Sequence, residues 1–255
     1  SFGVGRVSSL FVYPMSFDEF LTATGQEGLL RTKRNSSPTN PLPEAFYNRL
    51  VEAFRSYMLV GGMPEAVATY TETGSYRYSS DIVNEIIQGY QDDFAKYGAK
   101  ANPLLLRQTL ISVAHQAGAK FVYSRVEGQY RSAEVKVALE MLKDAGLIIP
   151  TYHTDANGVP LGAEINERVV KYLIHDTGVL LGILGIDDDI DDSIKEMMVA
   201  DSIDLVDKGH VAEMMAGLEL IKYSSPQKRH QLYYWQNMNK GTCAEVDYVI
   251  ARSGS

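Results

Sequence analysis

Three carboxylates toward the C-terminal end of the sequence have the residue types and spacing of a metal site. Glu245 and Asp247 alternate along CAEVDYVI, so both side chains lie on one face if this segment forms a strand. Glu213 lies in a segment with helical spacing of apolar residues. Carboxylate oxygens bind divalent cations, and a bound cation activates water for phosphodiester cleavage. The alternative is three solvated acids on a helix and an edge strand, because acidic side chains are mostly exposed.

A helix and two strands must position these acids. The segment GHVAEMMAGLELIKY, residues 209–223, predicts a helix with Val211, Met214, Met215, Leu218 and Ile221 on its main apolar face. Glu213 projects from the other side of this helix. Strands are predicted at about 231–236 and 244–251. A divalent cation would then lie between Glu213 and Asp247, with Glu245 assisting.

The preceding segment has the element order of a winged helix. Two helices, PLLLRQTLISVAHQAG and RSAEVKVALEMLKDAG, are followed by the strand LIIPTYHT, the turn DANG and a returning strand, EINERVVKYLI. The second helix carries three basic residues and three acidic ones, namely Arg131, Lys136, Lys143, Glu134, Glu140 and Asp144. DNA binding needs a basic face, so a protein-facing or structural role is favoured over DNA recognition.

The first hundred residues predict mainly helices. LFVYPM, residues 10–15, has the pattern of a short buried strand ended by Pro14. Ser16 and Glu19 have the spacing of a capping box. Helices are predicted over 44–60 and 76–97. Between them, GGMPE provides Gly61 to end the first helix and Pro64 to begin the next.

Composition limits the function further. The chain has 255 residues and a net charge of -8, which disfavours broad nucleic-acid binding. The single cysteine, Cys243, cannot form an internal disulfide, and no secretory signal is present, which together predict a cytoplasmic setting. No apolar run reaches the length of a membrane span. No GxxxxGK[ST] loop is present, so we expect no ATP hydrolysis by this chain.

An ordered set of motifs resembles the C-terminal portion of a group of bacterial and archaeal AAA-type ATPases. The set is GRVSSLFVYPMSFDEFL (5–21), YMLVGGMPEAV (57–67), DDFAKYG (92–98), KFVYSRV (120–126), LKDAGLI (142–148), KYLIHDTG (171–178), GHVAEMMAGLEL (209–220) and LYYWQN with AEVDYVI (232–250). The resemblance spans nearly the whole chain.

The resemblance implies a P-loop ATPase core before these motifs, then a winged helix and a domain related to PD-(D/E)XK nucleases. It also implies that ATP and magnesium bind only with that core, and that Arg6 contacts nucleotide in the intact protein or has a structural role there. In such nucleases a helix glutamate and a strand aspartate precede a Glu-x-Lys strand. Glu213 and Asp247 match the first two positions, and the sequence ends before a Glu-x-Lys strand.

We therefore predict a helix-rich α+β chain in three parts. Residues 1–100 form a helical AAA-type lid region, 101–168 a winged helix, and 169–255 an incomplete PD-(D/E)XK nuclease-like α/β module. The first functional hypothesis is a regulatory or interaction region of an ATPase, whose partner is another protein or its own ATPase core. The second is a metal-dependent nuclease module. The third is a winged-helix regulator that binds DNA.

Overall fold

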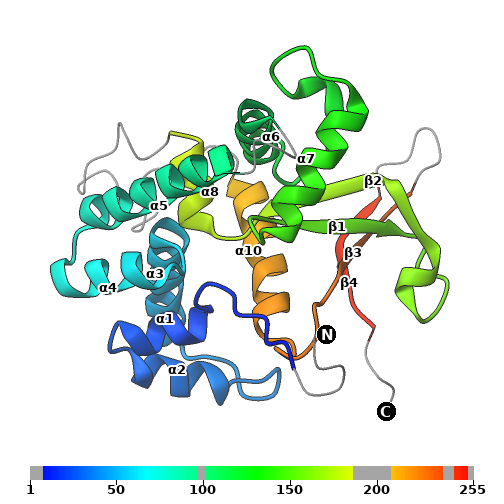
Figure 1. Ribbon diagram of the computed structural model, residues 1–255. Helices are drawn as coiled ribbons and strands as arrows, with labels where there is room; N and C mark the ends of the chain where they lie inside the picture. The colour runs from blue at the N-terminus through cyan, green and yellow to red at the C-terminus, as the bar shows by residue number, and fades with distance from the viewer. Residues whose placement is uncertain (1–7, 97–101, 186–207, 238–243, 252–255) are drawn as a thin grey trace.

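The protein is helix-rich and α+β, and its described residues form one four-stranded mixed sheet (Figure 1). The computed structural model describes residues 8–96, 102–185, 208–237 and 244–251. Arg6 therefore lies outside the described residues, as does the acidic run DDDIDD. Within the described residues, no helix is long and apolar enough to cross a membrane.

The described residues of the N-terminal part form five helices: α1 Phe17–Ala23, α2 Glu27–Arg34, α3 Glu44–Val60, α4 Pro64–Thr73 and α5 Tyr76–Lys96. The capping box at α1 is confirmed, because the Ser16 hydroxyl accepts from the Glu19 backbone and the Glu19 carboxylate accepts from the Ser16 backbone. Gly61 follows α3 with a φ of 77°, which a residue without a Cβ adopts readily. Pro64 begins α4, as predicted.

The middle part supplies the first two strands. In chain order it contains α6 Pro103–His115, the 3-10 turn η1 Tyr123–Arg125, α7 Ser132–Asp144, β1 Ile148–Thr154, the 3-10 turn η2 Leu161–Glu164 and β2 Ile165–Ile174. β1 and β2 pair antiparallel, with Thr151 opposite Lys171. The helices and strands expected for a winged helix are therefore present in the predicted order.

The last part extends this sheet. It contains α8 Thr177–Ile183, α10 Lys208–Lys222, β3 Leu232–Gln236 and β4 Glu245–Val249. The strand order is β2-β1-β3-β4, with β3 parallel to β1 and antiparallel to β4. α10 runs between the N-terminal helices and the sheet (Figure 1). The predicted boundary between residues 168 and 169 falls inside β2, because this strand pairs with β1 along both halves of its length.

One hydrophobic cluster runs through all three parts. It includes Phe20 of α1, Leu106 of α6, Leu173 of β2 and Met214 of α10, each at most 1% exposed. The three predicted parts therefore share a single core among the described residues.

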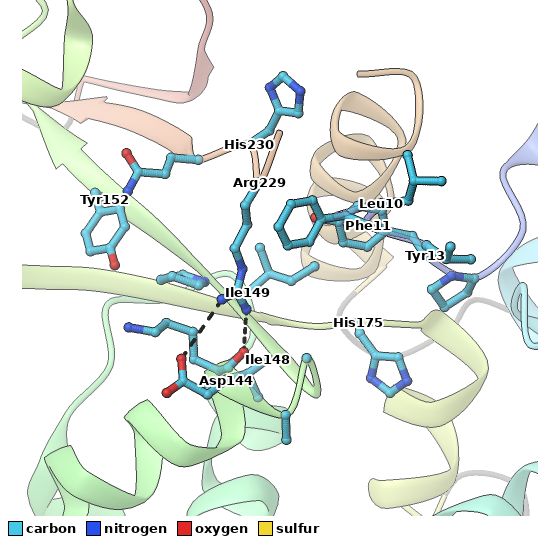
Figure 2. Close-up of a pocket in the computed structure, with 17 residues that line it drawn as sticks. Leu10, Phe11, Tyr13, Asp144, Ile148, Ile149, Tyr152, His175, Arg229 and His230 are labelled. Carbon is cyan, nitrogen blue, oxygen red and sulfur yellow. Dashed lines mark hydrogen bonds and ion pairs between the residues drawn. The ribbon is translucent and has the colours of Figure 1, made fainter. Parts of the chain in front are cut away.

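The prediction of a buried strand at residues 10–15 is wrong. Val12 is 90% exposed, and the segment has no strand pairing in the described structure. Its backbone instead makes isolated hydrogen bonds, from Phe11 to the Pro226 carbonyl and from Met15 to the Gly62 carbonyl. The segment crosses the surface beside the start of β1 and borders a cavity (Figure 2). A short apolar run alone does not distinguish a strand from such a segment.

Buried polar groups join α10 to the N-terminal helices. Lys222 Nζ donates to the Met15 carbonyl at 3.0 Å and to Tyr57 Oη at 2.7 Å. Tyr57 Oη lies 2.8 Å from Glu219 Oε1, and Glu219 Oε2 accepts from the Phe17 backbone. Because Lys222 is nearly buried, these contacts replace the hydration that its ammonium loses. They fix the position of α10, and Glu213 lies on the same helix, closer to its N-terminus than Glu219 and Lys222.

Asp176 is a buried acid at the start of α8. Asp176 is 1% exposed and accepts hydrogen bonds from the Gly62 and Val179 backbone amides. His175 precedes it, with Nδ1 3.1 Å from the Leu147 carbonyl and Nε2 3.2 Å from Tyr90 Oη. Burial lowers the pKa of His175, although the charge of Asp176 acts in the opposite direction.

Candidate metal site

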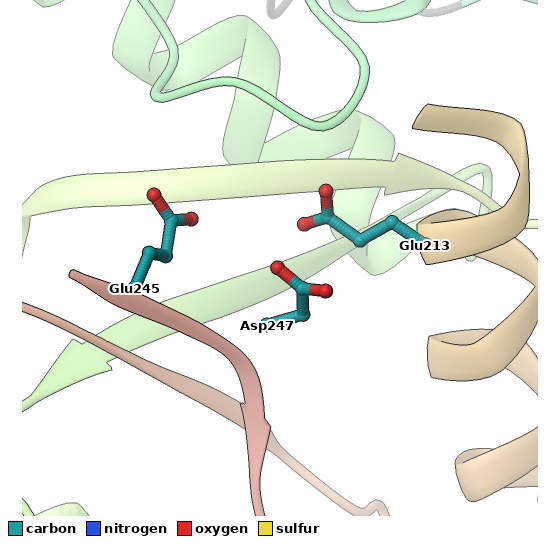
Figure 3. Close-up of side chains that lie close together, drawn as sticks. All are labelled: Glu213, Glu245 and Asp247. Carbon is teal, nitrogen blue, oxygen red and sulfur yellow. The ribbon is translucent and has the colours of Figure 1, made fainter. Parts of the chain in front are cut away.

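The fold brings Glu213, Glu245 and Asp247 together, as Figure 3 shows. One carboxylate oxygen from each residue lies within 4.8 Å of the other two. Glu213 extends from α10, whereas Glu245 and Asp247 extend from β4 toward the same space. Residues that are far apart in the sequence therefore lie close together, as predicted.

Close packing between α10 and β4 makes this meeting possible. A Cβ at Gly217 would lie 2.4 Å from Tyr248 Oη and 2.8 Å from Leu173 Cδ1, so only glycine fits there without movement. The same Tyr248 hydroxyl donates to the Glu213 carbonyl at 2.8 Å. The tyrosine thus ties β4 to the turn of α10 that carries the acidic side chain.

Lys171 is the fourth charged member of the cluster. Its Nζ donates to Glu213 Oε1 at 2.8 Å and also forms an ion pair with Glu245. The lysine side chain is only 6% exposed, and its Nζ lies 5.0 Å from the centroid of the Tyr234 ring. Among the described residues, Lys171 forms no ion pair with Asp247, which leaves that carboxylate available to a ligand.

The sequence analysis did not include Lys171 in the site. The signal was present, because Lys171 interrupts the apolar run VVKYLI, which forms the buried second half of β2. A lysine in such a strand needs a carboxylate partner, since burial of an unpaired ammonium costs several kcal/mol. The sequence did not show which carboxylates would meet it, because β2 and β4 are separated by two other strands.

The charges of the cluster do not cancel. Burial raises the pKa of Glu213, the Lys171 ammonium opposes this, and repulsion from Asp247 and Glu245 adds to it. Burial alone would lower the pKa of Lys171, but its hydrogen bonds to Glu213 and Glu245 hold it above its usual value. Three carboxylates around one ammonium leave a formal charge of −2 when all four groups are ionised.

Unpaired polar atoms lie beside the cluster. Tyr234 is fully buried, and its hydroxyl has no hydrogen-bond partner among the described residues. Burial, together with the negative charges of Glu245 and Glu213, raises the pKa of Tyr234 to about 12. On the neighbouring strand, Thr151 Oγ1 and His153 Nδ1 are also buried and have no hydrogen-bond partner in the described part of the chain. Such atoms usually have a partner in a native protein, often an ordered water.

The donor set fits a divalent cation. Carboxylate oxygens are hard ligands, and a residual charge of −2 is the charge that such an ion would neutralise. Lys171 already holds one oxygen of Glu213 and one of Glu245, so a cation would share these groups with it or displace it. Glu213 and Asp247 together with Glu245 would hold the ion.

Comparison with known proteins identifies one matching family. Residues 51–190 match the model of a family described as a domain of unknown function, DUF8612. The chain belongs to this family. The matched region of DUF8612 runs from α3 into the segment after α8, so it contains Lys171 but none of the three acids. No curated protein and no solved structure matches the chain.

Proposed function

We propose that this DUF8612 protein binds a divalent cation at Glu213, Glu245 and Asp247 and hydrolyses phosphodiesters there. One observation carries the proposal: three carboxylates have oxygens within 4.8 Å of one another, and two of them pair with a buried lysine. A nucleic-acid backbone is the substrate class. The negative charge of the whole chain requires that substrate contacts be local rather than spread over a basic face.

Each side chain has a distinct task in this proposal. Glu213 and Asp247 bind the cation, and Glu245 completes the carboxylate set. When bound, the cation supplies a water of lowered pKa and neutralises charge on the phosphate. The ammonium of Lys171 lies within the same cluster and stabilises negative charge that develops during cleavage. This lysine comes from β2, not from a Glu-x-Lys strand, so it departs from the pattern that the resemblance implies.

Calorimetric titration with manganese tests cation binding, and cleavage of labelled single- and double-stranded DNA tests the chemistry. We expect Asp247→Asn and Glu213→Gln each to lower cation affinity at least about 10-fold, since each removes a charged ligand. Glu167→Gln is the matched control, because Glu167 is an exposed carboxylate on β2 outside the cluster. Equal manganese affinity in all four proteins would exclude this metal site.

A second candidate function is a regulatory or interaction region of an AAA-type ATPase. The specific observation in its favour is that Lys171 already pairs with two of the three acids, which stabilises the cluster without a cation. In addition, the Lys222–Tyr57–Glu219 contacts connect α10 to the helices expected to form the lid. Movement of α1 and α3 would therefore be transmitted to the acidic cluster.

The second function has a separate test. The protein is titrated with a P-loop ATPase core of the kind the resemblance implies, in the presence of ATP or ADP. Nucleotide-dependent association without metal binding or DNA cleavage would support the regulatory role. Salt-sensitive DNA binding without cleavage would instead favour the winged-helix regulator, because phosphate contacts release counterions. Cleavage that depends on manganese and on Asp247 would favour the nuclease.

A further inference from the structure

A cavity on another part of the molecule has no role in the proposed chemistry. It has a volume of about 540 Å³ and lies between residues 10–14, the turn before β1 and residues 229–231 (Figure 2). None of Lys171, Glu213, Glu245 and Asp247 lines it. Its volume is within the range of small-molecule sites, roughly 300–1,000 Å³.

Arg229 is the main cationic group of this cavity. Its Nη2 donates to the Lys143 carbonyl at 2.6 Å, which fixes the guanidinium at the end of α7. Asp144 is the carboxylate that lines the cavity, and its oxygen is 3.9 Å from Arg229 Nη1, beyond hydrogen-bond distance. The Asp144 side chain is 73% exposed, so water screens its charge. The Arg229 side chain is about half exposed and remains accessible to a ligand.

Two tyrosines lie on either side of Arg229. Tyr152 comes from β1 and Tyr13 from the surface segment, and Figure 2 shows the arginine between them. Neither phenol has a hydrogen bond to another described residue. Burial raises the pKa of both phenols, and the positive charge of Arg229 opposes that rise in both. The phenols therefore remain protonated at neutral pH and can donate to an anion near the guanidinium.

Apolar and polar side chains share the remaining walls. Phe11 faces the cavity from the surface segment, and Ile148 and Ile149 face it from β1. Lys143 and His230 also line the cavity, but Lys143 is paired with Glu140, and His230 Nε2 lies 3.0 Å from the Ser225 carbonyl. The cavity thus combines a guanidinium and two phenols with several apolar side chains. Ligand sites commonly have this composition, with a few convergent polar groups in an apolar pocket.

We propose that this cavity binds a small organic anion with an aromatic or apolar body. The anionic group, a carboxylate or a phosphate monoester, accepts from Arg229 and from the hydroxyls of Tyr13 and Tyr152. The body packs against Phe11 and Ile149. Guanidinium groups favour both anions because two N–H groups can bind two oxygens at once. The site does not depend on the metal cluster or on its function.

The test is calorimetric titration of the purified protein with five probes. Phenylacetate and phenyl phosphate carry both the anion and the ring, acetate and inorganic phosphate lack the ring, and benzyl alcohol lacks the charge. We expect one or both of the first pair to bind and the other three to bind at least 10-fold more weakly. The aromatic anion that binds with the higher affinity shows whether the site prefers a carboxylate or a phosphate. No binding of either at about 10 mM, or equal binding of benzyl alcohol, would overturn the proposal.

Variants locate the binding site. Arg229→Gln should weaken binding about 10- to 100-fold, and Tyr152→Phe about 3- to 10-fold, because charged hydrogen bonds exceed single neutral ones in strength. Lys228→Gln is the charge-matched control, since Lys228 is exposed and does not line the cavity. If Arg229→Gln does not fold, the affinity of the double variant Tyr13→Phe, Tyr152→Phe is measured instead. Unchanged affinity in the folded variants would show that the anion binds elsewhere.

Discussion

Replacement of Lys171 by methionine tests the electrostatics of the acidic cluster directly. The substitution keeps an unbranched apolar side chain that is one atom shorter, and it removes the charge. Glu213 would then be left without its ammonium partner, with a side chain only 11% exposed. Removal of one partner from a buried ion pair costs about 3–5 kcal/mol of folding free energy.

Two features of the structure place the expected cost at the lower end of this range. The Glu245 side chain is 29% exposed, so this acid keeps part of its hydration after the lysine is lost. Glu213 can also take up a proton, because burial already raises its pKa and the lysine that opposes this effect is gone. We therefore expect a loss of about 3 kcal/mol at pH 8. The loss becomes smaller toward pH 5 as Glu213 protonates.

Divalent cations should reverse much of this loss. The variant has three carboxylates without a lysine, so its formal cluster charge is −3 and manganese should bind more tightly than in the wild-type protein. A ligand at ten times its Kd stabilises a protein by about 1.4 kcal/mol. At one fixed manganese concentration, the increase in unfolding free energy should therefore be larger for Lys171→Met than for the wild type.

Urea denaturation with EDTA or with manganese, at pH 5 and pH 8, measures all of these quantities. Lys136→Met is the control, because Lys136 is an exposed lysine on α7, and its loss should change stability by less than about 0.5 kcal/mol. If Lys171→Met is as stable as the wild type in EDTA, the lysine does not compensate buried charge. If manganese stabilises the variant less than the wild type, Lys171 and the cation do not compete for the same carboxylates.

Three further predictions concern the supporting structure, each measured by urea denaturation. In the wild type, His175 binds a proton at higher pH in the unfolded state than in the folded state, so stability falls by up to about 1.4 kcal/mol per pH unit below pH 6.5. His175→Asn should reduce this loss. Gly61→Ala should lower the free energy of unfolding by at least about 3 kcal/mol, because the new Cβ would clash with Asp176 Oδ1. Gly74→Ala is the control: Gly74 has a φ of 67° but open space around it, so the loss should be about 1 kcal/mol. Lys222→Met should cost about 2–3 kcal/mol, and a loss below 1 kcal/mol would show that its buried hydrogen bonds do not stabilise the junction.

Local signals predicted the helices well. The helix predicted over 44–60 is α3 with the same ends, because Pro43 precedes it and Gly61 follows it. The Ser16 and Glu19 capping box was also predictable, since it depends only on residues three positions apart. By contrast, the apolar residues Leu10 and Val12 suggested a buried strand and are exposed. Burial of such a short segment depends on what the rest of the chain places over it.

The candidate metal site was predictable only in part, for a reason of topology. Glu245 and Asp247 share a face because side chains alternate along a strand, and this is visible in the sequence. Lys171 joins them only because β3 inserts beside β1 in parallel and places β4 beyond it. No local pattern specifies that strand order. A lysine within an apolar strand was the available signal, and it indicated an acidic partner without identifying it.

The shared sheet makes the cluster sensitive to both halves of the protein. Lys171 lies on the strand that pairs with β1, whereas the acids lie on α10 and β4. A shift of α10 relative to β2 would therefore separate Lys171 from Glu213 and raise the net charge available to a cation. The Lys222 and Tyr57 contacts connect that shift to α3. If pairing with lysine and binding of a cation compete for the same oxygens, any event that moves the N-terminal helices should change metal affinity. Tyr57→Phe tests this link, because it removes a hydroxyl that contacts Lys222 and Glu219 but not Glu213. Altered manganese affinity in a folded variant supports the link, and unchanged affinity refutes it.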